Sequence, residues 1–264
     1  MTGANESTTA VGTGGGHPQG TPSWIDLQVP DVAAGLDFYC GLFGWDPGPE
    51  GPPEVGGYRM PRLGGATVCG VGPVMQAGAP PAWTLPFAVD DVDEAAARVA
   101  ARGGAVLLGP MDVLDAVRMG VFADPAGAHF GLSQERQVRG FEVTHVPGAF
   151  AWAELATSDL AGARAFYPAI LPRVTEKRWD GEFEYHLLVS AGKDVAGMFA
   201  LPDASMPPAW TVSLQSADVE QTAARAREAG ADLLMGPTMT PGVGTWAVLR
   251  DPQGATFGLL QPPD

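Results

Sequence analysis

Apolar and polar residues alternate along the segment WIDLQV at 24–29, which predicts a strand with one buried face. Along the next segment, 32–44, apolar residues return at helical spacing, which predicts an amphipathic helix. Asp31 stands where a helix N-cap is expected, and Gly44 is the residue type that ends helices in the left-handed conformation. The first folded unit is therefore predicted to open with a strand and a helix.

Further strands follow, and the strand–helix order then starts again. Strands are predicted at 57–63, 66–71, 83–89, 105–110, 116–125 and 128–132, with a second amphipathic helix at 90–104. The pattern of one strand, one helix and several strands thus occurs twice before residue 133.

Short sequence words recur at a fixed interval. PPAW begins at 80 and 207, GP at 109 and 236, and DP at 124 and 251, each pair 127 positions apart. Near the start, WxDLxxxD at 24–31 matches WxELxxxD at 152–159, a shift of 128. Such self-similarity indicates a tandem duplication. The predicted organisation is a disordered tail at 1–20, a domain at 21–135, a linker at 136–147 and a second domain at 148–262.

Composition and charge exclude several classes of partner. The 264 residues are 45% hydrophobic, which suits soluble cores, and no apolar run is long enough to span a membrane. The start lacks the pattern of a signal peptide, so a cytoplasmic protein without a membrane partner is expected.

The net charge of −15 disfavours nucleic acid as a binding partner. The surplus acid either keeps the protein soluble or favours a cationic small molecule. Cys40 and Cys69 are expected to be small buried residues.

Three longer motifs give the chain a family resemblance. They are DxxxxxxFYxxLFGW at 31–45, FAVDDVDEAAARVAARGG at 87–104 and DPAGAHFGL at 124–132, each with a copy in the second half. The chain resembles the vicinal oxygen chelate (VOC) superfamily of glyoxalases, bleomycin-resistance proteins and extradiol dioxygenases. Within it, the chain is most similar to two-domain actinobacterial proteins of glyoxalase-like or hydroxylase type. The resemblance implies an α+β fold with four βαβββ modules that form open half-barrels around cavities.

The resemblance also implies where a divalent metal would be bound. The superfamily usually supplies His or Gln seven residues before the Asp that opens a helix, and Glu seven residues after the turn Asp. Here those positions hold Trp24, Thr84, Gly131, Trp152, Thr211 and Gly258. An indole only donates, a neutral hydroxyl binds metals poorly, and glycine has no side chain. No metal and no other cofactor is therefore predicted.

The same replacements suggest a site for something flat and apolar. Trp24 and Trp152 would offer broad faces, while glycine at 131 and 258 would widen the space. Asp26 and Glu154 lie two residues further along, on the same strand face. Each acid could act as a general base or bind a cationic group, and burial would raise its pKa. The alternative is that the tryptophans belong to the core and the acids are structural.

Other candidates are more dispersed. His186 alternates with Tyr185 and could face the cavity as a proton shuttle, so the candidate catalytic residues are Asp26, Glu154 and His186. The loop at 173–184 is richer in charged and aromatic residues than its counterpart at 46–57, so it is the candidate lid. The remaining residues predicted to contact a ligand are Met60, Trp83, Thr84, Met119, Trp179, Met198, Trp210, Thr211 and Trp246.

These features favour a metal-free protein that binds an aromatic or hydrophobic small molecule, such as a natural product, in self-resistance or as a biosynthetic carrier. The rival hypothesis is a cofactor-independent enzyme acting on a polyketide-like aromatic intermediate. A third is a housekeeping or stress protein with a vestigial cavity. The duplication would make the chain a pseudo-dimer within a monomer, or half of a homodimer.

Overall fold

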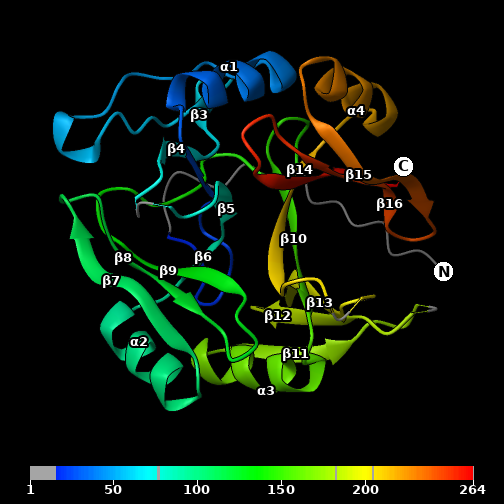
Figure 1. Cartoon of the computed structure of the whole chain (residues 1–264). Coiled ribbons are helices and arrows are strands. Elements are labelled where there is room, and N and C mark those ends of the chain that lie inside the picture. Colours follow the sequence, from blue (N-terminus) through cyan, green and yellow to red (C-terminus); the bar gives the residue numbers. More distant parts are fainter. Residues whose placement is uncertain (1–15, 76–77, 182, 204, 264) are drawn as a thin grey trace.

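The computed structural model describes residues 16–75, 78–181, 183–203 and 205–263. The described chain contains four βαβββ-type units, which confirms the predicted α+β fold (Figure 1). The first half consists of β1 (Asp26–Val29), α1 (Val32–Phe43), the 3₁₀ turn η1 (Pro53–Val55), β2 (Arg62–Leu63), β3 (Ala66–Thr67), β4 (Gly70–Pro73), β5 (Ala82–Thr84), β6 (Pro86–Ala88), α2 (Val92–Ala101), β7 (Ala105–Val113), β8 (Val117–Ala123) and β9 (His129–Glu135). The second half consists of β10 (Phe150–Thr157), α3 (Leu160–Ile170), β11 (Val174–Arg178), β12 (His186–Ser190), β13 (Lys193–Ala200), β14 (Ala209–Gln215), α4 (Val219–Glu228), β15 (Asp232–Thr240), β16 (Gly244–Arg250) and β17 (Thr256–Gln261).

An aspartate begins each of the four α-helices. Asp31, Asp91, Asp159 and Asp218 each accept a hydrogen bond from the backbone N–H three residues on, at 2.8 to 3.0 Å. These bonds satisfy one of the unpaired donors at a helix start. Gly44 ends α1 with a φ of 71°, as the sequence predicts.

In each half, two units join edge to edge through their first strands. The second half forms one sheet in the order β11-β12-β13-β10-β14-β17-β16-β15, with β10 antiparallel to β14. The first half has the corresponding order, but it is divided into β4-β1-β5, β6-β9-β8-β7 and the pair β2-β3. The sheet of the first half breaks after Thr84, just before Pro86, which has no N–H to donate to a neighbouring strand. The position that corresponds to Pro86 in the second half is Ser213, and there β14 continues without a break.

Each sheet has one buried and one partly open face. Along β10, Trp152, Glu154 and Ala156 are partly exposed, whereas Ala153 and Leu155 between them are buried. We call the face that carries Trp152 and Glu154, and its counterpart with Trp24 and Asp26, the open face. Any ligand that approaches the sheet from solvent meets this face.

The two halves interlock through buried hydrogen-bond chains on the opposite face. Trp83 donates through its indole N–H to the Tyr39 hydroxyl at 2.9 Å, and that hydroxyl donates to Asp251 of the other half at 3.0 Å. The reciprocal chain runs from Trp210 through Tyr167 to Asp124, at 2.9 and 3.0 Å. We call these the junction chains. Helix α1 accordingly lies beside α4, and α2 beside α3 (Figure 1).

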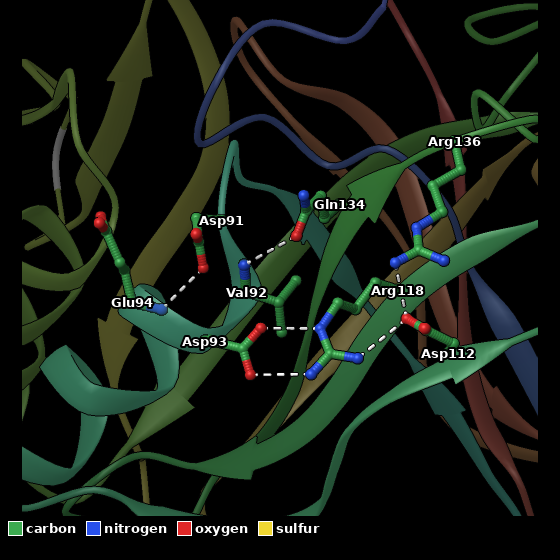
Figure 2. Close-up of polar contacts among 8 residues, drawn as sticks. All are labelled: Asp91, Val92, Asp93, Glu94, Asp112, Arg118, Gln134 and Arg136. Carbon is green, nitrogen blue, oxygen red and sulfur yellow. Dashed lines mark hydrogen bonds and ion pairs between the residues drawn. The ribbon is translucent and has the colours of Figure 1, made fainter.

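One charged cluster belongs to the first half alone. Arg118 on β8 donates two bonds to Asp93 of α2, at 2.7 and 2.8 Å, and one to Asp112 of β7 at 2.9 Å; Arg136 also binds Asp112 (Figure 2). The residues 127 positions after Asp93, Asp112 and Arg118 are Glu220, Met239 and Thr245. Met239 is 67% exposed, so the corresponding edge of the second sheet is apolar.

The predicted tail at 1–20 falls largely outside the described residues. Residues 16–20 of that segment contact the first domain, where the His17 N–H donates to Glu135 and the Gly20 N–H donates to the Ala88 carbonyl. No helix within the described ranges is long and apolar enough to cross a membrane.

Candidate functional site

A tyrosine links the tryptophan and the acid on the open face of the second half. The Trp152 indole N–H donates to the Tyr185 hydroxyl at 2.9 Å, and this hydroxyl donates to Oε1 of Glu154 at 2.6 Å. Trp152 and Glu154 share a face because they are two residues apart on β10. The glutamate is thereby held in one orientation.

The first half repeats this arrangement. Trp24 donates to Tyr58 at 3.1 Å, and Tyr58 donates to Oδ1 of Asp26 at 2.6 Å. We call these two groups the open-face chains. The sequence pattern indicates the tryptophans and the acids as site residues but not the two tyrosines. The sequence does contain a signal for the two tyrosines, because Tyr58 and Tyr185 are separated by the same 127 positions as the other repeated words.

Two glycines make room for the tyrosines. Gly70 on β4 pairs with Asp26, and Gly197 on β13 pairs with Glu154. A Cβ added at Gly70 would overlap the Tyr58 hydroxyl, and one at Gly197 would overlap the Tyr185 hydroxyl. Each open-face chain therefore requires glycine on the neighbouring strand.

The electrostatics of both chains follow from burial. Desolvation raises the pKa of Glu154 and of Asp26, and the hydrogen bonds from the tyrosines partly offset the rise. Burial and the adjacent carboxylates raise the pKa of Tyr58 and Tyr185, so both hydroxyls stay protonated and donate. In each open-face chain, a protonated tyrosine hydroxyl therefore donates to a carboxyl whose charged form is destabilised by burial.

The residues at the family's metal positions do not fit a divalent ion. The indole N–H groups of Trp24 and Trp152 donate to tyrosines, and Thr84 and Thr211 lie opposite Asp26 and Glu154 on the adjacent strands. Among the described residues, no group of three or more His, Cys, Asp or Glu side chains could hold a metal ion. Binding without metal remains a prediction.

The glycines at 131 and 258 allow close packing of neighbouring strands. They do not widen a ligand space, as the sequence had led us to expect. A Cβ at Gly258 would overlap the Ser213 hydroxyl on β14, and one at Gly131 would approach Pro86 atoms to 3.0 Å. The space that glycine leaves is taken by the neighbouring strand.

An aromatic wall distinguishes the second open-face chain. Ring centroids are 5.0 Å apart for Trp179 and Phe183, 5.6 Å for Phe183 and Tyr185, and 6.2 Å for Tyr185 and Phe199. Phe183 is 47% exposed, and Trp179 and Phe199 are partly exposed. The positions 127 earlier than Trp179, Phe183 and Phe199 hold Pro52, Gly56 and Gly72. Apolar surface for a ligand therefore lies mainly in the second half.

The first open-face chain is more enclosed. Trp24 is 9% exposed, and its ring lies 5.8 Å from that of Phe141, which comes from the segment between the halves. Phe141 in turn stacks on Phe150 at 5.0 Å. Trp152 in the second half is partly exposed by contrast.

His186 does not join the open-face chain. Its side chain is buried on the other side of β12, where Nδ1 contacts Glu176 and Nε2 lies 3.3 Å from Glu184. Arg164 of α3 also binds Glu176, at 3.1 Å. Strand alternation thus directs His186 and Tyr185 to opposite faces.

Several other predicted contact residues lie away from Glu154. Trp83 and Trp210 belong to the junction chains, and Met198 is fully buried on the face opposite Glu154. Trp246 lies on β16, three strands from β10, and donates to Thr240 at 3.0 Å. Met60 packs against the core of the first half, and Met119 lies on β8 opposite Ser133.

A hollow of about 520 Å³ lies elsewhere in the second half. It is lined by Pro18, Gln19, Arg173, Thr175, Val189, Ser190, Ala191 and Gly192. Neither carboxylate of the open-face chains contributes to its wall. The candidate site is therefore the open face around Glu154, separate from this hollow.

Comparisons with known proteins agree with this architecture. A family model described as "Glyoxalase/Bleomycin resistance protein/Dioxygenase superfamily" matches residues 21–132, and one described as "Glyoxalase-like domain" matches residues 152–260. The anthracycline biosynthesis protein DnrV of Streptomyces peucetius is 40% identical over 260 residues, covering 92% of this chain and 93% of DnrV. The Mycobacterium bovis protein CFP32, provisionally named a glyoxylase, is 38% identical over 252 residues, covering 93% and 96%. The Mn(II)-bound glyoxalase from Novosphingobium aromaticivorans shares the fold, with a TM-score of 0.63 at 19% identity, covering 94% of this chain and 84% of that one.

Proposed function

The chain belongs to the Glyoxalase/Bleomycin resistance protein/Dioxygenase superfamily, and on that premise we propose that it binds an aromatic or hydrophobic small molecule without a metal ion. The proposed site is the open face of the second half. Glu154, Tyr185 and Trp152 form its polar centre, and Trp179, Phe183 and Phe199 form its apolar wall.

One observation carries this proposal. The hydrogen-bonded Trp–Tyr–acid arrangement occurs in both halves, whereas the aromatic wall beside it occurs only in the second. A scaffold feature is expected in both copies of a duplication. A group of partly exposed aromatic rings in one copy is the pattern of a ligand surface.

The names of two relatives suggest the ligand class. DnrV and DauV are named as anthracycline biosynthesis proteins, and both match more than nine-tenths of this chain. A natural product of secondary metabolism, held for self-resistance or for transfer in biosynthesis, is the ligand class that we propose. We place the protein in the cytoplasm, as a monomer with an internal pseudo-dimer or as a homodimer.

Fluorescence tests the binding function. A planar polycyclic quinone such as quinizarin should quench tryptophan emission saturably, and Trp152→Phe and Trp179→Phe should each remove part of that quenching. Phe183→Ala leaves the number of tryptophans unchanged and should weaken binding by about tenfold, because the wall loses its most exposed ring. Trp24→Phe, at the enclosed counterpart, and Met75→Ala, at an exposed residue away from the site, are the matched controls.

The proposal would be wrong if quenching rose without saturation. It would also be wrong if Trp152→Phe and Phe183→Ala, both folded by circular dichroism, bound quinizarin as the unmodified protein does.

Acid–base catalysis on an aromatic polyketide-like intermediate is the second candidate function. Burial raises the pKa of Glu154, which brings the carboxyl nearer to the range of a general acid or base. Glu154→Gln should then lower turnover by about 10² to 10⁴, well beyond any loss of ligand affinity. Mass spectrometry of products formed in an extract of the native host would separate an enzyme from a carrier.

A further inference from the structure

The two oxygens of the Glu154 carboxyl differ in their surroundings. Oε1 accepts the bond from Tyr185 at 2.6 Å. Among the described residues Oε2 makes no hydrogen bond, and it is also not among the enclosed side-chain atoms that lack a partner. Oε2 is therefore not fully enclosed by the protein.

Within the part of the chain that the structure describes, no second donor reaches this carboxyl. Tyr185 donates its one proton to Oε1 and accepts from Trp152, so it has no further proton to donate to Oε2. Lys177 of β11 pairs with Asp194 at 2.8 Å, and Arg164 of α3, on the opposite side of the sheet, pairs with Glu176 at 3.1 Å. Within the described residues, no ion pair involves Glu154. A half-buried carboxylate with one unpaired oxygen is stabilised by a hydrogen-bond donor that a ligand supplies.

We infer that the ligand carries a protonated amine, which binds Oε2 of Glu154 while its aromatic or hydrophobic body lies on the wall of Trp179, Phe183 and Phe199. This inference rests on the proposed binding function and specifies the chemical class of the ligand.

The surroundings favour a cation over a neutral donor. Aromatic faces attract ammonium groups, and the rings of Trp179, Phe183 and Tyr185 lie within 6.0 Å of one another beside the carboxyl. The net charge of −15 adds a long-range attraction for cations. The first half has the matching acid, Asp26, without the aromatic wall, so it serves as an internal control.

Isothermal titration calorimetry with a matched pair of probes tests this inference. The probes are 1-naphthylmethylamine, protonated at pH 7, and the neutral 1-naphthylmethanol, which share one aromatic body. The amine should bind about tenfold more tightly than the alcohol. Glu154→Gln should bring the amine to about the affinity of the alcohol and leave the alcohol unchanged. Asp26→Asn should preserve the tenfold preference. Trp179→Ala should weaken both probes, because the apolar wall loses a ring, and should weaken the amine more, because its cation–π attraction is lost as well.

Equal affinity of the unmodified protein for both probes, or a preference that persists in Glu154→Gln, would overturn the inference and leave the proposed binding function standing. Failure of both probes to bind would overturn the proposed function as well. Circular dichroism confirms that each variant is folded.

Discussion

At the scale of single residues, Tyr58 and Tyr185 determine how the carboxyls of the open face are presented. Each tyrosine fixes one carboxyl oxygen, and among the described residues the other oxygen has no hydrogen-bond partner. The sequence placed Asp26 and Glu154 on the same face as the tryptophans, because a spacing of two in a strand fixes the side. It could not place the tyrosines, since each follows a loop and reaches the acid only through tertiary packing. The repeat interval was the available signal.

The raised pKa of Glu154 gives a pH-dependent stability. A carboxyl whose pKa is raised by folding contributes fully to stability below its usual pKa of 4.5, and this contribution is lost as the pH rises through the raised value. Glu154→Gln stays neutral and still accepts the bond from Tyr185. The variant should thus match the unmodified protein near pH 4.5 and be more stable than it at pH 7, where the buried carboxyl of the unmodified protein is charged.

Urea unfolding at pH 5 and pH 8 measures this difference. Asp26→Asn should behave in the same direction, because burial also raises the pKa of Asp26. A stability gain for Glu154→Gln that shrinks as the pH rises would show that the carboxyl is stabilised in its charged form.

Single residues also decide whether the protein can bind a divalent metal ion. The positions that would supply ligands hold tryptophan, threonine and glycine, and both indole N–H groups are committed to tyrosines. Elemental analysis of protein dialysed against each of Zn²⁺, Ni²⁺, Fe²⁺ and Mn²⁺ should find well below one ion per half. About one tightly held ion per half, removed by a chelator with loss of ligand binding, would contradict this.

At the scale of elements, the helices were predictable and the strands before β4 were not. Asp31 and Gly44 mark the ends of α1 in the sequence and in the structure. The predicted strands at 57–63 and 66–71 shrink to β2, β3 and β4. Gly64 and Gly65 between them adopt φ values of 58° and 91°, which force a tight turn. This turn lies in the gap between the two predicted strands, whereas their shortening follows from pairing that the apolar periodicity does not encode.

The strand glycines facing the tyrosines should tolerate no side chain. Gly197→Ala places a methyl group on the Tyr185 hydroxyl, so it should destabilise the protein by about 1 to 3 kcal/mol and weaken ligand binding. Gly41→Ala is the matched control, since Gly41 is an exposed position in α1 with nothing within 4 Å of the added Cβ. That substitution should stabilise by about 0.5 to 1 kcal/mol because alanine favours helix.

Chemical denaturation of both variants gives the comparison. Similar effects of the two substitutions would mean that Tyr185 can move aside without cost, and the packing argument for Gly197 would fail.

At the scale of the whole molecule, the repeated DP turns hold the halves together. Oδ1 of Asp251 accepts backbone N–H groups of its own turn at 2.8 to 3.0 Å, while Oδ2 accepts from Tyr39 of the other half. Asp124 does the same toward Tyr167. The repeat identified these turns in the sequence as family motifs. Their role between the halves depends on how the two sheets dock, which no local pattern encodes.

The junction chains should make the two halves unfold as one unit. Tyr39→Phe removes one hydroxyl and leaves buried polar atoms of Trp83 and Asp251 without a partner, which should cost about 1 to 3 kcal/mol. Because Tyr39 lies in the first half and Asp251 in the second, the melting of both halves should shift together, by about 2 to 4 °C per kcal/mol.

Native-state hydrogen exchange resolves the amides of β6 and β14 separately and should report the same lowered opening free energy for both strands. Tyr167→Phe, the mirror substitution, should give the same joint shift. If Tyr39→Phe lowered protection in the first half alone, the halves would be independently folding domains joined by a contact that contributes little to either.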